Sequence, residues 1–325
     1  MASWMPVNFT TKPSRRIMKN YFDFNLAGRK LLPIWIAFLL LFVVPYSIII
    51  LKMQNIQVGD TSSLILLPLL LLVVIIAFFI TFYIRKLSIE NISYNNESIQ
   101  FNGKFGKYMG IVLLGFFLTT ITLGIYGAWF VRDIYRFFVD NTSYKSNNLK
   151  FQGKGGKLLL IMLLAIIIPI VVLTIVMAQF LISYSESSAL SILFQIIIMV
   201  IAIPYAYLSY KWMVDIKYKE YQISWDTKFW ESCGKIAIEL LLTVITLGIY
   251  YPLAMLRLYK YFTQKTCVEN NEVKMKLGYD IEQSKDFLFI WGQTLLSIIT
   301  LGIYYPWAFC KISKRVLSKT YLESN

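Results

Sequence analysis

The sequence predicts an all-α polytopic membrane protein with four full transmembrane helices, three Gly/Pro-broken helical hairpins and short cytoplasmic β segments. Three observations lead to this fold class: the composition, a repeated six-residue string and the distribution of basic residues. Of the 325 residues, 57% are hydrophobic and only 15% are charged. Soluble domains carry about 45–50% apolar and about 25% charged residues. The composition therefore favours a membrane protein.

Four long apolar blocks predict the transmembrane helices. They cover residues 31–51, 64–84, 158–182 and 189–210, and none contains a charged residue. Each is close to or above the roughly 20 residues that a helix needs to cross a hydrocarbon core of about 30 Å. A helix at the surface of a soluble protein would need a polar face, and these blocks have none.

The string Ile-Thr-Leu-Gly-Ile-Tyr occurs three times, at residues 121–126, 245–250 and 299–304. Glycine often ends a helix, and proline is well suited to the first turn of the next one. The apolar blocks 108–131, 236–256 and 287–310 are therefore expected to break at their glycines. The residues expected to form these turns, or to line a pathway if the turns meet, are Thr122, Gly124, Tyr126, Thr246, Gly248, Tyr250, Pro252, Thr300, Gly302, Tyr304 and Pro306.

The positions of the cations favour hairpins over crossings. If the three repeat blocks crossed the membrane, the protein would have seven kinked spans and its Lys and Arg residues would be divided evenly between the two sides. If each block returns to the side it left, only Lys52 of the 32 cations lies on the opposite side. Bacterial membrane proteins concentrate Lys and Arg in cytoplasmic loops. This predicts a multi-pass protein of the bacterial inner membrane with both termini cytoplasmic, with seven spans as the alternative.

A second repeated element precedes two of the apolar blocks. Gly-Lys-x-Gly-Lys occupies residues 103–107 and 153–157, after the alternating segments 98–101 and 148–151, which suit short strands. Neither copy has the Gly-x4-Gly-Lys-Ser/Thr spacing of a phosphate-binding loop, so the lysines are interpreted as anchors at the membrane surface. Together with the cations that follow the turns, the expected lipid headgroup contacts are Lys104, Lys107, Arg132, Lys154, Lys157, Arg257 and Lys311.

These two elements resemble the YjgN family of uncharacterised bacterial inner-membrane proteins. The resemblance covers most of residues 92–320 and is clearest after Gly248 and Gly302, since the first copy has Gly127-Ala128 where the others have Tyr-Pro. It implies a membrane protein and supplies no activity. The expected organisation is a cytoplasmic segment (1–30), a two-span hairpin (31–91), the first repeat unit (92–157), a second two-span hairpin (158–220) and two further repeat units (221–325).

Several function classes are disfavoured. The chain has no histidine and three scattered cysteines, so no metal site, cofactor or catalytic triad is expected, and the protein is not expected to be an enzyme. The net charge of +14 lies in loops beside apolar blocks, which does not suggest nucleic-acid binding. Glu239 is the one carboxylate inside an apolar block, and its spacing from Lys235 predicts an ion pair one helical turn apart.

Two functions remain. The first is a transporter or channel for a small solute, because broken helices can line a path through a membrane. The alternative is a membrane scaffold or envelope factor whose basic cytoplasmic surface binds anionic lipid or partner proteins. The expected partners are membrane lipid and either another protein or a second copy of the chain.

Overall fold

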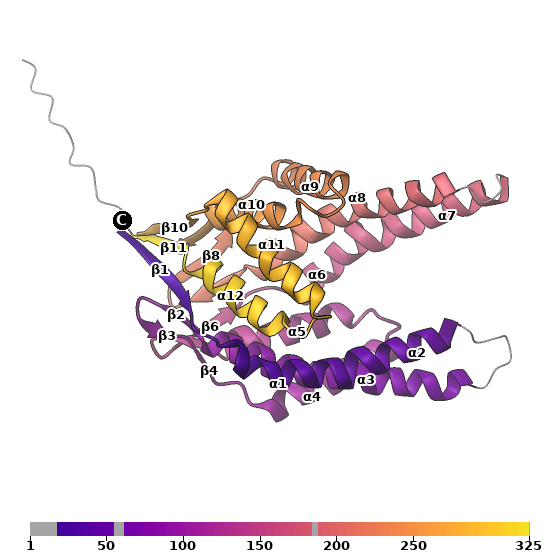
Figure 1. Ribbon diagram of the computed structural model, residues 1–325, viewed down its shortest axis with the longest axis horizontal. Helices are drawn as coiled ribbons and strands as arrows, with labels where there is room; N and C mark the ends of the chain where they lie inside the picture. Colours follow the sequence, from indigo (N-terminus) through magenta and orange to yellow (C-terminus); the bar gives the residue numbers. More distant parts are fainter. Residues whose placement is uncertain (1–17, 55–61, 184–187, 325) are drawn as a thin grey trace, which may run out of the picture.

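The computed structural model describes residues 18–54, 62–183 and 188–324. Short strands gather at one end of the molecule, and pairs of helices extend from them in one general direction (Figure 1). Residues 1–17, expected to form most of the cytoplasmic segment 1–30, lie outside the described residues.

The strands form a single antiparallel sheet of eleven strands in the order β3-β2-β1-β11-β10-β9-β8-β7-β6-β5-β4. The edge strands β3 and β4 are consecutive in the chain and separated by Ile99 alone, so the sheet curls into a nearly closed barrel. The strands are β1 (Met18–Phe24), β2 (Ile92–Tyr94), β3 (Glu97–Ser98), β4 (Gln100–Phe101), β5 (Thr142–Tyr144), β6 (Asn147–Phe151), β7 (Ile216–Tyr218), β8 (Tyr221–Trp225), β9 (Thr266–Glu269), β10 (Lys274–Tyr279) and β11 (Thr320–Ser324).

The prediction of an all-α protein was therefore wrong. Short β segments had been expected near residues 98–101 and 148–151, and strands do lie there, but no sequence pattern indicated one continuous sheet. The physical reason is that strands of two to seven residues are too short to show a clear alternation. Their pairing is also non-local, since Met18 pairs with Ser324.

Five helical hairpins extend from the sheet. In the first long hairpin, one arm consists of α1 (Gly28–Phe38), the π-helical η1 (Leu39–Val43) and α2 (Val44–Gln54), and the other arm is α3 (Ser62–Glu90). In the second long hairpin, one arm consists of α6 (Gly155–Met162), the π-helical η2 (Leu163–Ile167) and α7 (Ile168–Ser183), and the other arm is α8 (Ser188–Met213). The three short hairpins, which carry the repeated string, are α4 (Phe105–Ile121) with α5 (Gly127–Asp140), α9 (Phe229–Ile245) with α10 (Tyr251–Gln264), and α11 (Gln283–Ile299) with α12 (Tyr305–Leu317).

Every hairpin leaves one strand and returns to the neighbouring strand of the same sheet. The strand pairs are β1/β2, β4/β5, β6/β7, β8/β9 and β10/β11. A backbone hydrogen bond of 2.9 Å closes each base: Asn25 to Asn91, Asn102 to Asn141, Gln152 to Asp215, Asp226 to Lys265, and Asp280 to Lys319. The fold is thus a fivefold repeat, although only three units share the repeated string.

The helix lengths divide the hairpins into two classes. Four stretches, 28–54, 65–90, 155–179 and 192–213, are long and apolar enough to cross a membrane, and at most 17% of each such window is buried in the protein. This is compatible with a membrane protein. The first arm of each short hairpin has 17 residues, about 26 Å at 1.5 Å per residue, which is less than the roughly 30 Å hydrocarbon core.

The hairpins form a ring in which neighbours touch, and α1 packs on α12 to close it. Two tryptophans that follow the repeated turns fit against glycines of the long hairpins. A Cβ added to Gly155 would lie 2.6 Å from the Trp129 ring, and one added to Gly28 would lie 2.7 Å from the Trp307 ring. Both glycines therefore set the approach of a long hairpin to a short one.

Gly155→Ala is expected to lower the unfolding temperature of the detergent-solubilised protein, because the added methyl group overpacks the Trp129 contact at a cost of about 1–3 kcal/mol. The matched control is Gly156→Ala at the next residue, where a Cβ meets nothing within 4 Å. That variant should be unchanged or slightly more stable, since alanine favours helix over glycine. Equal unfolding temperatures for the two variants would contradict this packing.

Candidate functional site

The three repeated turns have the same hydrogen-bond geometry. In each, the threonine hydroxyl donates to the carbonyl four residues earlier and accepts the backbone N–H of the tyrosine four residues later. The donated bonds are 2.7–2.8 Å and the accepted bonds 2.9–3.0 Å for Thr122, Thr246 and Thr300. One side chain therefore satisfies a carbonyl of the first arm and an N–H of the second.

The backbone at each turn has a positive φ at two successive residues, the leucine and the glycine. Gly124, Gly248 and Gly302 have φ of +92°, +87° and +85°, which glycine adopts without steric cost. The preceding leucines, Leu123, Leu247 and Leu301, also have positive φ, near +50°, which costs a side-chain-bearing residue about 1–2 kcal/mol. Their side chains are 93%, 93% and 89% exposed. Each short hairpin thus ends in a strained, apolar and fully exposed tip.

The turn tyrosines connect the two arms of the hairpins. Tyr250 donates to Glu239 Oε2 (2.8 Å) and accepts from Arg257 (2.7 Å), while Lys235 lies 2.6 Å from Glu239 Oε1. The Glu239 side chain is 1% exposed. Lys235 is the partner that the four-residue spacing predicted.

The other two hairpins use different residues at the same positions. Tyr304 donates to Gln293 (3.0 Å) and accepts from Lys311 (2.8 Å). In the first of the three short hairpins, Gly115 stands where Glu239 and Gln293 stand, and the Phe130 ring lies against it. An ionised carboxylate is therefore not required at this position, which favours a structural role for the bridge.

Two of the three turns are each held by a tryptophan of the neighbouring hairpin. The Trp291 indole of α11 donates to the Ile249 carbonyl (2.7 Å), and the Trp35 indole of α1 donates to the Gly302 carbonyl (2.8 Å). Each of these two turns is therefore held by the next hairpin around the ring. A hollow between α10, α11 and α12 is lined by Pro252, whereas no residue of the first turn lines it. The proposed pathway through all three turns lacks this geometric support.

The seven cations expected at lipid headgroups fall into two groups. Arg132, Arg257 and Lys311 bind within the protein, to Asp133 or to the turn tyrosines. Lys104, Lys107, Lys154 and Lys157 are exposed at the starts of α4 and α6, and within the described residues their ammonium groups have no protein partner. Lys228, the residue before α9, was missed. Counting 20 residues back from Gly248 would have found it, as the same count from Gly124 gives Lys104.

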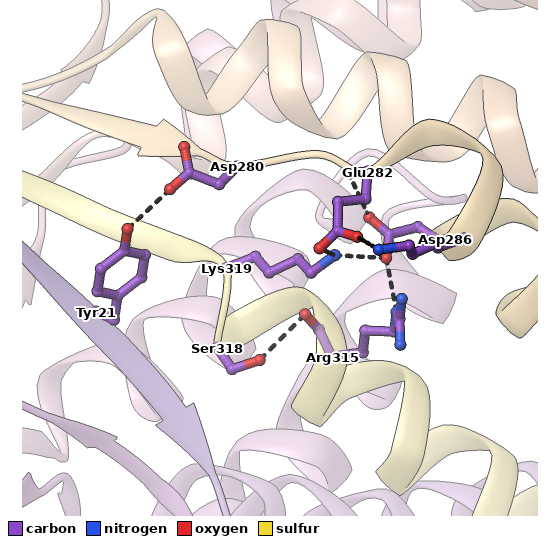
Figure 2. Close-up of polar contacts among 8 residues, drawn as sticks. Tyr21, Asp280, Glu282, Asp286, Arg315, Ser318 and Lys319 are labelled. Atoms are coloured by element: carbon purple, nitrogen blue, oxygen red, sulfur yellow. Dashed lines mark hydrogen bonds and ion pairs between the residues drawn. The ribbon is translucent and has the colours of Figure 1, made fainter.

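A charged cluster at the base of the fifth hairpin was also missed (Figure 2). Asp286 is fully buried and accepts from Arg315 (2.6 Å), Lys319 (2.7 Å) and the Glu282 backbone N–H (2.9 Å). Burial alone would raise the pKa of Asp286, but the hydrogen bonds from Lys319, Glu282 and Arg315 outweigh it and hold the pKa below its ordinary value. The cluster joins α11, α12 and Lys319, the residue just before strand β11.

Equivalent positions in the other short hairpins hold uncharged pairs. The rings of Tyr108 and Phe137 lie 5.4 Å apart, and the Ser232 hydroxyl lies 3.1 Å from that of Tyr261. Tyr108 and Ser232, like Asp286, are 0% exposed. The base of a short hairpin is thus locked by an aromatic, a hydroxyl or an ionic pair.

Asp286→Asn is expected to destabilise the protein by on the order of 2–3 kcal/mol. This is below the roughly 3–5 kcal/mol for breaking a fully buried pair, because Arg315 and Lys319 are partly exposed. Because the folded-state pKa is lowered, the stabilisation is present above the unfolded-state pKa of about 3.9 and is lost as the pH falls through the folded value.

Unfolding temperatures between pH 7 and pH 3 test this, with Glu282→Gln as the exposed control. The wild-type protein should lose more stability below about pH 4 than Asp286→Asn does, and Glu282→Gln should have a much smaller effect at pH 7. Parallel pH profiles for the wild-type protein and Asp286→Asn would contradict the ionic lock.

Two family models match the chain, and both describe families of unknown function. Residues 96–266 match the family described as "Bacterial protein of unknown function (DUF898)", and residues 222–323 match a "Family of unknown function (DUF6693)". No curated protein and no solved structure matches the chain. The first match covers more than half of the 325 residues and confirms the resemblance drawn from the repeats. The chain therefore belongs to DUF898, the YjgN family of bacterial proteins of unknown function.

Proposed function

We propose that the protein is an inner-membrane scaffold that binds anionic phospholipid. In this proposal the two long hairpins cross the bilayer, and the three short hairpins enter it from the cytoplasmic side without crossing it. The sheet and both termini lie on the cytoplasmic side, where the basic loops are expected.

The observation that carries the proposal is that a lysine directly precedes three of the helices. Lys104, Lys154 and Lys228 directly precede α4, α6 and α9, have extended backbones and make no side-chain cap. A cation is unfavourable at the positive end of a helix dipole. The combination of free backbone N–H groups and lysine is, however, well suited to bind a phosphate. Lipid headgroups at the membrane surface would supply that phosphate at each of these three helix starts.

The tips of the short hairpins support the same arrangement. Each carries an exposed Ile-x-Leu-x-Ile stripe, and in the fourth hairpin Ile245, Leu247 and Ile249 are 67%, 93% and 61% exposed. Such a tip is unfavourable in water and favourable in hydrocarbon. Arms of about 26 Å that start at the headgroups would place the tips inside the hydrocarbon core.

Transport of a small solute receives less support from the geometry. A path through the turns would require polar groups that face a common space. The turn glycines have nothing within 4 Å of an added Cβ, and the turn leucines are exposed. The broken helices are therefore better explained as turns that reverse the chain within the membrane.

The proposal is tested by the lipids retained after purification from vesicles that contain phosphatidylglycerol and phosphatidylcholine in equal amounts. The wild-type protein should retain phosphatidylglycerol preferentially. Lys104→Gln/Lys107→Gln/Lys154→Gln/Lys157→Gln should reduce this preference at least about tenfold, because each cation near an anionic surface contributes about 1 kcal/mol.

A second quadruple variant, Lys217→Gln/Lys219→Gln/Lys274→Gln/Lys276→Gln, removes the same charge from the strands and their turns and serves as the control. It should keep the preference. Equal retention of both lipids by the wild-type protein, or equal losses in the two variants, would contradict a role for the helix starts.

A further inference from the structure

Four of the five contacts between neighbouring hairpins are filled by buried apolar side chains. An aromatic cluster around Phe82 and Tyr108 fills the space between the first and second hairpins. Clusters around Trp212, Tyr207 and Leu31 fill the spaces between the second and third, the third and fourth, and the fifth and first hairpins. Close packing between neighbours is therefore the rule in this ring.

The contact between the fourth and fifth hairpins is different, because it contains a hollow of about 490 Å³. It runs along α10, α11 and α12 from Tyr251 and Tyr305, just after the turns, to Val316 near the sheet. Met255, Ile290 and other apolar side chains line it.

The hydroxyl groups of α11 in this hollow do not make it polar. Thr294 donates to the Ile290 carbonyl and Ser297 donates to the Gln293 carbonyl, each at 2.9 Å. Both hydroxyl groups thus donate their hydrogen bonds within α11. Water in a cavity needs two to four polar partners, whereas an apolar cavity of 150 Å³ already binds benzene. The hollow has about three times that volume and favours an apolar occupant.

We propose that this groove, defined as the hollow between α10, α11 and α12, holds one acyl chain of a phospholipid. The inference rests on the proposed function for its location inside the membrane, where hydrocarbon chains are the surrounding apolar groups. It goes further by naming one binding groove among the five contacts. An acyl chain would occupy the space that buried apolar side chains occupy in the other four.

The experiment uses phosphatidylglycerol and phosphatidylcholine that each carry a diazirine in one acyl chain, with the full-length protein in nanodiscs. After irradiation, mass spectrometry maps the labelled peptides. Label should be at least fivefold enriched on groove-facing residues of α10 and α12 over exposed residues of α3 and α8. Even labelling of all apolar helices in the wild-type protein would overturn the inference without the need for any variant.

Ser297→Phe and Ser313→Phe place rings in the groove and should reduce the α10 and α12 label at least fivefold. Ile298→Phe, next to Ser297 on α11 but 61% exposed, is the matched control and should keep it. Unchanged label in both filling variants would overturn the groove as the site.

The two lipids separate this inference from the proposed function. If both lipids label the groove equally and the protein retains neither preferentially, the acyl-chain groove stands and the anionic-lipid function fails. If phosphatidylglycerol is preferred but its chain labels the helices evenly, the function stands and the groove fails.

Discussion

The architecture depends on one constraint, which is that each helical hairpin must begin and end on adjacent strands of the same sheet. The 2.9 Å backbone hydrogen bond at every base expresses this constraint five times. Buried backbone groups need partners, and strands of two to seven residues satisfy theirs only by curling into a nearly closed sheet. All five hairpins therefore extend from the same sheet, whatever their length. They can differ in length and sequence without a change in the strands at their base.

The hairpins vary in two respects that matter for a membrane. Within the described residues, the first arm of each long pair contains a π-helical segment and the second arm is one continuous helix, whereas the short pairs reverse at a Leu-Gly turn that follows a threonine. At the base, Tyr108–Phe137, Ser232–Tyr261 and Asp286–Arg315 fill one position with three kinds of chemistry. The ionic version includes Lys319, the residue whose carbonyl closes the fifth base, and so ties helix packing directly to the end of the sheet.

The sequence was informative where the determinants are local. Apolar blocks predicted the four long helices, and Thr246, Gly248 and Pro252 predicted a break whose hydrogen bonds all lie within a few residues. It was uninformative where the determinants are distant in the chain. Met18 and Ser324 pair across the whole sequence, and the Asp286 cluster depends on Lys319, 33 residues away. Periodicity also cannot show that Leu123, rather than glycine alone, adopts a positive φ.

The central claim is that all short hairpins return to the side on which they begin. It is tested by labelling single cysteines in the turns between strands with a membrane-impermeant maleimide, in intact cells and in inverted vesicles. Ser146→Cys, Glu220→Cys and Asn271→Cys should all label only in inverted vesicles, because the proposed topology places the whole sheet on the cytoplasmic side. Labelling of residues 146 and 220 from outside, with residue 271 labelled from inside, is the pattern of seven crossings and would contradict the account.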